Sequence, residues 1–410
     1  MQDFQLSQQI LGLAEPWRVK AVTLRRAVAE VAIQVECTER VWGCPQCQQR
    51  RHVHEWEARR WRHLDRCQFQ TIIVAEVPRV RCPEHGTQTV AVPWAEKYGR
   101  FTRLFERLAL DLLLECSVSA ACQILGISWA EADGIKQRAV ARGLARKVAV
   151  PATRLGVDEK SAGRGQNYVT VVANLEPGHP ATVEYVGDGR KQEALDGYWQ
   201  QLPAAHREQV QAVAMAMWEP YFNSTVAPVP AARAKIVHDP YQVGGMLNQA
   251  VDRVRKTEHR VLSEAGDDRL AGTKYVWLYG WENLPPTQQE RFDQLRGQRL
   301  KTGRAWALKE MFRDFWAGET AAEGRAFFGR WYGWAIRSRL EPIKKVARSL
   351  KAHLDNILTY FTHRITNAAL EGLNNRIAGL VKKAFGYRNR ERFKTDILFH
   401  LGGLNLYPTQ

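Results

Sequence analysis

The chain has 410 residues, of which 45% are hydrophobic, so it is long enough for two or three domains with substantial cores. Lys and Arg number 59 against 43 acids, a formal net charge of +16. This surplus favours a polyanionic partner and a long electrostatic surface, and it argues against a short localisation tag. The sequence contains no apolar run long enough to span a membrane and no signal peptide after Met1, which excludes a membrane protein and favours the cytoplasm.

The first candidate site is a set of paired metal ligands. All seven cysteines lie before residue 123. Cys44-Pro45-Gln46-Cys47 and Cys82-Pro83-Glu84-His85 are two ligand pairs with the spacing of a structural zinc site. The alternating pattern of residues 68–80 predicts a strand between the pairs. We therefore predict a closed Cys₃His zinc site at hairpin ends. The remaining cysteines (Cys37, Cys67, Cys116 and Cys122) lack paired spacing and are expected to be small buried residues.

A helix-turn-helix pattern follows the cysteine region. Residues 105–115 form a helical run, and a second run continues from residue 117 to Lys147 with an interruption at Gly126. Gly126 is suited to end one helix and Ser128 to cap the next. Basic side chains on the last helix predict insertion into a DNA groove, and a plain helical hairpin is the alternative. These side chains are Lys136, Arg138, Arg142 and Arg146.

From Leu155 the pattern changes to strands and then alternates with helices. Strands are expected at 155–158, 168–175, 182–186, 210–215 and 234–237, with helices at 191–202 and 218–226. Gly163-Arg164-Gly165 predicts a turn. The order is that of a ribonuclease-H-like mixed sheet, in which the first strand is central, the fourth lies beside it and the fifth lies outside the fourth.

The acids of this region are few. Asp158 ends the first strand, and a metal-binding partner would belong at the end of the fourth, because neighbouring strands lie about 4.8 Å apart. That end reads Ala214-Met215-Ala216-Met217-Trp218 and holds no acid. Asp239 ends the fifth strand, about 10 Å from Asp158 by the same spacing. Glu159 follows Asp158, and its side chain is expected to point to the opposite face of the sheet.

A last informative segment runs from Asn367 to Phe393. Its apolar residues recur at helical spacing, so one face packs inward. One carboxylate, Glu371, stands among amides and is followed by basic residues. This arrangement favours an acid that binds a metal ion while cations hold a polyanion, and an amphipathic helix with a solvated basic face is the alternative.

Together these segments resemble the insertion-sequence transposases of the ISL-three (ISL3) family. The likeness rests on the ligand pairs, the helix-turn-helix, Gly156-Val157-Asp158-Glu159, the Met215–Tyr221 segment, Ile236–Tyr241 and Asn367–Asn389. The resemblance implies an Asp-Asp-Glu triad on a ribonuclease-H-like fold, with Asp158 first and Glu371 last. The Met-Asp-Met-Trp pattern of the family would place the second Asp at position 216, where this chain has Ala216.

The resemblance also implies a role for each residue. Asp158 and Glu371 would bind catalytic Mg or Mn, and Ala216 would leave the site short of a bridging ligand. Asp239 would act as a second-shell or structural group that caps the helix from Pro240. The cations near Glu371 would hold DNA phosphates. These cations are Arg376, Lys382, Lys383, Arg388 and Arg390.

The predicted organisation has five parts: a zinc-binding region at 1–95, a helix-turn-helix at 96–150, a first catalytic part at 151–244, a helical insertion at 245–362 and a last catalytic part at 363–410. The aromatic residues of the insertion are expected to form its core. The expected partner is double-stranded DNA (terminal inverted repeats and target DNA), bound by a nucleoid-associated homodimer. The resemblance implies a DNA transposase that catalyses metal-dependent cleavage and transfer of element ends, with this chain expected to be inactivated by Ala216. A catalytically dead DNA-end binder acting as repressor or synapsis factor, and a structure-selective nuclease, are the alternatives.

Overall fold

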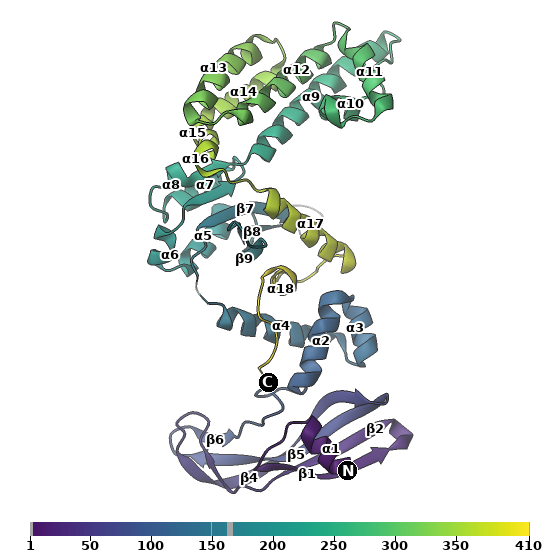
Figure 1. Cartoon of the computed structure of the whole chain (residues 1–410), viewed down its shortest axis with the longest axis vertical. Helices are drawn as coiled ribbons and strands as arrows, with labels where there is room; N and C mark the ends of the chain where they lie inside the picture. Colours follow the sequence, from purple (N-terminus) through teal and green to yellow (C-terminus); the bar gives the residue numbers. More distant parts are fainter. Residues whose placement is uncertain (1–2, 149, 162–166, 410) are drawn as a thin grey trace. The chain divides into compact units, whose positions relative to one another are not determined.

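A computed structural model describes residues 3–148, 150–161 and 167–409. The chain divides into two compact units, Met1–Lys147 with Leu404–Gln410, and Val148–Gly403 (Figure 1). The predicted turn at Gly163–Gly165 lies outside the described residues. Within the described ranges, no helix combines the length and apolarity needed to cross a bilayer.

The first unit begins with a short helix and a β-sheet. Its sheet order is β1-β2-β5-β4-β3, with β6 paired to β5. Three tryptophans hold the sheet core together, because Trp17 and Trp61 both pack edge-on against Trp94, at 5.0 and 5.3 Å between ring centroids. The expected strand at residues 68–80 lies within β5. The elements are α1 (Asp3–Ile10), β1 (Trp17–Arg25), η1 (Arg26–Val28), β2 (Glu30–Cys37), β3 (Val41–Gly43), β4 (Arg50–Arg66), β5 (Phe69–Cys82) and β6 (Gly86–Thr89).

Helices α2 (Arg103–Glu115), α3 (Val118–Leu125) and α4 (Trp129–Arg146) follow the sheet. Gly126 ends α3 in the left-handed conformation, with φ of 64°, a conformation that suits glycine. Ser128 accepts a hydrogen bond from the backbone N–H of Glu131, and the Glu131 side chain accepts one from the Ser128 N–H. This capping box starts α4, so the predicted helix-turn-helix and both of its boundary residues are confirmed.

The second unit contains a five-stranded mixed sheet in the order β11-β10-β7-β8-β9. The central strand β7 pairs in parallel with β10 and antiparallel with β8. This is the strand order predicted from the sequence. Two strand starts were wrong. β10 begins at Ala212 rather than at residue 210. β11 begins at Ile236 because Ala234 belongs to helix α8, in keeping with the high helix propensity of the Ala-Arg-Ala-Lys run. The elements are β7 (Arg154–Ser161), β8 (Tyr168–Asn174), β9 (Thr182–Asp188), α5 (Gln192–Gln201), α6 (Ala204–Glu208), β10 (Ala212–Met215), α7 (Glu219–Val226), α8 (Ala232–Lys235) and β11 (Ile236–His238).

Helices cover the two faces of this sheet. On one face, Val157 and Met215 pack with Trp199 of α5 and Tyr221 of α7. On the other face, the sheet packs against α17 (Ala368–Lys383) and α18 (Arg390–Leu401) through a separate apolar cluster that includes Phe393. Because successive residues of a strand alternate between faces, residues 156 and 158 face α17 while residues 157 and 159 face α5 and α7.

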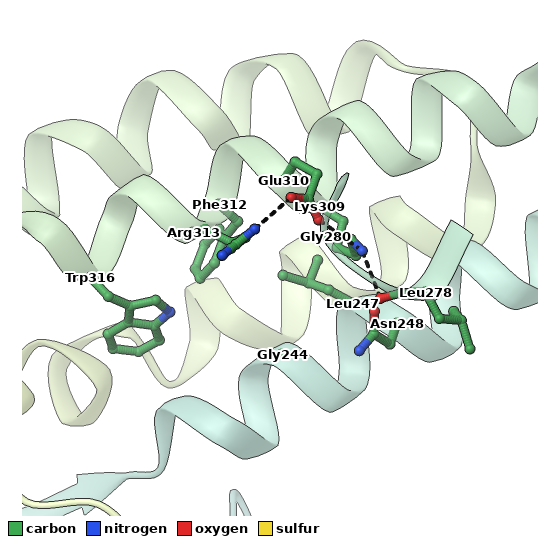
Figure 2. A pocket seen from close by; sticks show the side chains of 10 residues that line it. All are labelled: Gly244, Leu247, Asn248, Leu278, Gly280, Lys309, Glu310, Phe312, Arg313 and Trp316. Carbon is green, nitrogen blue, oxygen red and sulfur yellow. Dashed lines mark hydrogen bonds and ion pairs between the residues drawn. The ribbon is translucent and has the colours of Figure 1, made fainter. Parts of the chain in front are cut away.

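A bundle of helices separates β11 from α17 along the chain. Its core includes Trp277 and Trp331, which are fully buried, so the prediction of a core role is confirmed for them, whereas Trp281 and Trp334 are exposed. Buried Lys309 donates to the backbone carbonyls of residues 277–279 and pairs with Glu310 beside a cavity of about 200 Å³ (Figure 2). The helices are α9 (Pro240–Glu264), α10 (Lys274–Leu278), η2 (Trp281–Asn283), α11 (Pro286–Arg296), α12 (Lys301–Arg313), η3 (Asp314–Ala317), α13 (Ala321–Arg337), α14 (Glu341–Ala352), α15 (Leu354–Leu358) and α16 (Tyr360–His363).

Candidate functional site

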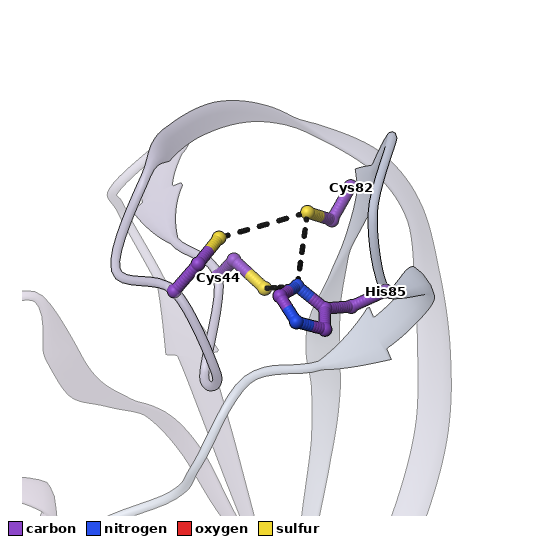
Figure 3. Close-up of side chains that lie close together, drawn as sticks. Cys44, Cys82 and His85 are labelled. Carbon is purple, nitrogen blue, oxygen red and sulfur yellow. Dashed lines mark hydrogen bonds between the residues drawn. The ribbon is translucent and has the colours of Figure 1, made fainter.

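The two predicted zinc-ligand pairs come together at the ends of strands. Cys44 and Cys47 follow β3, while Cys82 ends β5 and His85 precedes β6. Their four ligand atoms all lie within 4.8 Å of one another. The Cys47 and Cys82 sulfurs are 3.7 Å apart, and the His85 Nδ1 lies 3.4 Å from the Cys82 sulfur and 3.8 Å from the Cys44 sulfur (Figure 3). Tetrahedral zinc with Zn–S bonds of about 2.3 Å separates its ligands by about 3.7 Å, so the donor set and its spacing fit this metal.

The environment of Cys82 favours the thiolate that a zinc site needs. Burial alone raises the pKa of its thiol, but hydrogen bonds from His85 and from the backbone outweigh this effect and lower the pKa to about 6. His63, another histidine of the first unit, is buried and hydrogen-bonded to Thr102, 2.9 Å away. The expectation that the other cysteines are buried is wrong for Cys67, which is exposed in a left-handed turn between β4 and β5 with φ of 49°. It is met only in part by Cys37, Cys116 and Cys122, which are half-buried.

The basic residues of α4 do not form the exposed stripe that the sequence suggested. Arg142 pairs with Glu96 and Glu106 at 2.8 and 3.1 Å, and its side chain is only 8% exposed. Glu106 also binds Arg138. This correction has a physical reason, because Glu106 is 2% exposed and a buried carboxylate requires cationic partners.

The other two predicted DNA contacts on α4, Lys136 and Arg146, also interact within the first unit. Lys136 is 2% exposed. Arg146 donates to the carbonyl of Tyr407 in the C-terminal segment, and Arg142 donates to the neighbouring carbonyl of Leu406. Arg138 and Arg142 therefore hold α4 to Glu106 of α2, and Arg142 and Arg146 hold it to residues 406–407. In this arrangement the buried Lys136 and Arg142 are not available to phosphates.

In the second unit, three positions at the ends of neighbouring strands lie side by side on one face of the sheet. Met215 of β10 pairs with Val157 on one side and with His238 on the other. The next residues along these strands are Asp158, Ala216 and Asp239. Positions directly opposite each other in parallel strands share a face, so position 216 lies between the two aspartates on the face covered by α17.

Helix α17 approaches this face closely because β7 has a glycine there. A Cβ atom at Gly156 would lie 2.8 Å from Asn367 Oδ1 and 3.2 Å from a methyl group of Leu370. Asn367 donates from Nδ2 to the Val157 carbonyl at 3.2 Å, and one turn later Glu371 follows on the same helix. The close approach brings Glu371 towards Asp158, although 213 positions separate them in the chain.

The charge of Glu371 acts on both aspartates. Burial, together with the charges of Glu159, Asp239 and Glu371, raises the pKa of Asp158 to about 6. Burial raises the pKa of Asp239 as well, and Glu371 adds to this effect. The charge of Glu371 and a hydrogen bond with it raise the pKa of Tyr241. The charges of Asp158, Asp239 and Glu371 therefore interact, and among the described residues the main influences on the pKa values of the two aspartates include no cation. We call these three residues the acid cluster.

Asp239 is occupied by backbone groups. Its Oδ2 accepts from the N–H of Gln242 at 3.2 Å, which caps α9, and its Oδ1 accepts from the N–H of Asn367 at 2.9 Å. The prediction that Asp239 caps the helix from Pro240 is confirmed. Through these two bonds Asp239 joins the start of α9 to the start of α17.

Asn374 is a site residue to which sequence reasoning gave no role. Its Nδ2 donates to Asp158 Oδ2 at 2.8 Å, and the Glu159 N–H donates to Oδ1 at 2.9 Å. Asn374 lies three residues after Glu371, so one helical face presents both side chains, and this spacing was the available signal. Glu159 lies on the other face, since its β8 partner Thr170 bonds to Tyr221 there at 2.9 Å.

The predicted basic residues after Glu371 are exposed. They lie on the outer side of α17 and in the segment that leads to α18. Among the described residues, the structure shows no carboxylate partner for Arg376, Lys382, Arg388 or Arg390, whereas Lys383 has an interaction within the chain. This surface carries free positive charge next to the acid cluster.

Comparison with known sequences agrees with this architecture. Residues 155–397 match the profile of a family described as transposase, residues 90–140 match the helix-turn-helix domain of transposase family ISL3, and residues 40–85 match the zinc-finger of transposase IS204/IS1001/IS1096/IS1165. The chain is 26% identical over 368 residues to the transposase for insertion sequence element IS1001 of Bordetella parapertussis, covering 88% of this chain and 89% of that protein. It is also 26% identical over 374 residues to the transposase for insertion sequence element IS1557 of Mycobacterium tuberculosis, covering 84% of this chain and 82% of that protein.

Proposed function

Because the chain belongs to the ISL3 family of transposases, we propose that it binds the terminal repeats of an insertion sequence through a ribonuclease-H-like domain with an incomplete cleavage site. In this proposal Asp158 is the first acid of an Asp-Asp-Glu triad and Glu371 the last. Ala216 occupies the position of the second acid. The chain then binds double-stranded DNA at the element ends, as a homodimer on paired ends, but does not cut it.

The observation that carries this proposal is the location of position 216. It lies between Asp158 and Asp239 at the ends of neighbouring strands and on the face covered by α17. A carboxylate at this position would lie next to Asp158, since neighbouring strands are about 4.8 Å apart. Asp239 is a poor replacement because it follows β11, which lies two strands away from β7, and because its oxygens hold the starts of α9 and α17 in place.

The side chains at this site supply part of the ligand set that a hard divalent cation needs. Asp158 and Glu371 supply carboxylate oxygens, which Mg²⁺ and Mn²⁺ prefer. Such ions, when bound, would activate water or a DNA 3′-hydroxyl and stabilise the leaving oxygen. With alanine at 216 the bridging ligand of a two-ion site is missing, so we expect weak metal binding in this chain.

The residues around the acids fix their orientation. Asn374 holds one oxygen of Asp158, and the Glu159 N–H holds the other. Raised pKa values on Asp158 and Asp239 indicate that the cluster binds protons more readily than ordinary carboxylates. Arg376, Lys382, Lys383, Arg388 and Arg390 would hold phosphates near the acids. In the first unit, Cys44, Cys47, Cys82 and His85 would hold a structural zinc ion.

Nicking of a terminal-repeat duplex in Mg²⁺ tests the proposal. We expect no nicking by the parent chain, nicking by Ala216→Asp, and none by Ala216→Asp combined with Glu371→Gln. If the reversion nicks no better than the parent, the assignment of position 216 is wrong. A chain that binds the repeats but stays inactive after reversion is instead a DNA-end binder that acts as repressor or synapsis factor.

A structure-selective nuclease is the remaining alternative. Joining of a cleaved 3′ end to plasmid DNA by Ala216→Asp would identify a transposase. Cleavage of branched duplexes without any joining would identify the nuclease.

A further inference from the structure

Phe385 is the most exposed large apolar side chain of the described residues, at 101% of the reference exposure. It follows α17 in the sequence Lys382-Lys383-Ala384-Phe385-Gly386-Tyr387-Arg388. A fully exposed phenyl ring gains nothing from the core, and large apolar groups on a surface often mark a binding site. The ring therefore requires an explanation outside the packing of the fold.

The backbone at Phe385 also adopts a left-handed conformation, which residues other than glycine rarely adopt. The N–H of Gly386 donates to the Val381 carbonyl at 2.9 Å and the N–H of Phe385 to the Lys382 carbonyl at 3.1 Å. These two bonds form a Schellman motif, in which Phe385 occupies the left-handed position with φ of 53°. Glycine is strongly preferred there, since a side chain strains the left-handed conformation. The sequence thus keeps an aromatic ring at a position where glycine would end the helix more easily.

The segment after Phe385 is anchored. Tyr387 donates a hydrogen bond to Asp396 at 2.7 Å, and its ring packs on buried Phe393 at 4.8 Å between centroids. Gly386 supplies a second left-handed residue, with φ of 95°. The turn is therefore fixed on both sides, and the Phe385 ring projects from a defined position.

Exposed cations flank Phe385 in the sequence. Lys382 precedes it by three residues, while Arg388 and Arg390 follow it, and all three are exposed with no carboxylate partner among the described residues. An exposed aromatic ring among cations matches the surface of single-stranded and distorted DNA, where phosphates bind the cations and an unstacked base binds the ring.

We propose that Phe385 stacks on, or inserts beside, a DNA base while the neighbouring cations bind the adjacent phosphates. This inference rests on the proposed function, because DNA is the ligand. Fourteen residues separate Phe385 from Glu371 along α17, a rise of about 20 Å, which equals about six base pairs of duplex. A duplex that runs along α17 is then distorted about six base pairs from the cleavage site.

The test uses the full chain and two 30-base-pair duplexes, one fully paired and one with a single unpaired 2-aminopurine. Affinity is measured by fluorescence anisotropy, and stacking by quenching of the 2-aminopurine. We expect the parent to prefer the duplex with the unpaired base and to quench it. Phe385→Gly should lose about 5-fold to 100-fold in affinity for that duplex, with little change for the paired one, and Phe385→Trp should retain the preference.

Phe385→Gly also separates a binding role from a structural one. Because glycine relieves the left-handed strain, this variant should melt at or above the temperature of the parent. Tyr275→Ala, which removes a 54% exposed ring from the insertion, serves as the control and should bind both duplexes as the parent does.

Several outcomes would overturn the inference. Unchanged binding and quenching by Phe385→Gly would show that the ring does not contact the DNA base. A melting temperature below that of the parent would show that the ring stabilises the fold. A dimer that becomes a monomer on this substitution would assign the ring to a protein interface. If the parent binds neither duplex, the proposed function fails together with this inference.

Discussion

Asn374 on α17 donates a 2.8 Å hydrogen bond to Asp158 on β7, and so joins the last part of the second unit to its central strand. The bond holds a carboxylate that is largely buried and whose pKa is raised to about 6. Among the described residues no cation is a main influence on the pKa of Asp158, so its ionised form destabilises the fold unless a metal ion or another cation binds.

The first prediction concerns the pH dependence of stability. The folded pKa of Asp158, about 6, lies above its ordinary value of 3.8, so the unfolded chain releases this proton at lower pH than the folded chain. The stability contribution is fully present below pH 3.8 and is lost as the pH rises through 6. In EDTA, Asp158→Asn should therefore gain up to about 3 kcal/mol relative to the parent between pH 4 and pH 7, measured by urea unfolding.

A matched control for this titration is Asp355→Asn, which changes a side chain that is 86% exposed. Because an exposed surface charge contributes little to stability, this change should alter the unfolding free energy by less than about 1 kcal/mol. A constant difference for Asp158→Asn would show that Asp158 ionises as freely in the folded chain as in the unfolded chain.

The second prediction concerns the glycine that lets α17 approach β7. Gly156→Ala places a methyl group 2.8 Å from Asn367 Oδ1 and from a methyl group of Leu175, so we expect a loss of about 1–3 kcal/mol in unfolding free energy. Gly372→Ala, next to Glu371, has open space around its Cβ and should be neutral or stabilising by up to about 1 kcal/mol. Equal effects of the two changes in urea unfolding would argue against close packing at Gly156.

The sequence could predict the sheet of the second unit because its strands are short, apolar and separated by clear turn signals. Strand order then followed from the alternation of strands and helices. It could also predict the zinc ligands, because their spacing is local. Strand ends and family resemblance predict Asp158, Ala216 and Glu371 as site positions. The hydrogen bond from Asn374 to Asp158 depends on the depth at which α17 packs, which only the structure shows.

The basic residues of α4 show why the contacts of a charged side chain could not be predicted from the sequence. Arg142 binds Glu106 and Glu96, which precede it by 36 and 46 residues, and no periodic pattern connects them. A basic helix that holds its own unit together and one that binds DNA have similar sequences, because both place arginines at helical spacing. Burial of the partner carboxylate decides between them.

The third prediction tests this assignment. Glu106→Gln removes the buried carboxylate that binds both Arg138 and Arg142 and leaves Arg142 with Glu96 alone, so we expect a loss of about 3 kcal/mol in unfolding free energy. Arg142→Gln should lower stability similarly, with no change in the salt dependence of DNA affinity. Arg388→Gln should have the opposite effects. Its unfolding free energy should equal that of the parent, while the slope of log DNA affinity against log salt concentration should fall in magnitude by about 1.

The fourth prediction concerns the zinc ligands. Cys44→Ser should remove bound zinc, measured by elemental analysis of the purified chain, and lower the melting temperature, because a structural zinc ion contributes to folding directly. Cys67→Ser changes an exposed cysteine outside the cluster and should keep the full zinc content. A chain purified without zinc, or equal zinc in both variants, would contradict the assignment.

The central claim is that position 216 lies in one metal-binding cluster with Asp158 and Glu371. Calorimetric titration with Mn²⁺ at pH 7.5, without DNA, tests it most directly. We predict that Ala216→Asp binds Mn²⁺ at least about 10-fold more tightly than the parent, and that adding Glu371→Gln removes the gain. Equal Mn²⁺ affinity for the parent and Ala216→Asp would contradict the account.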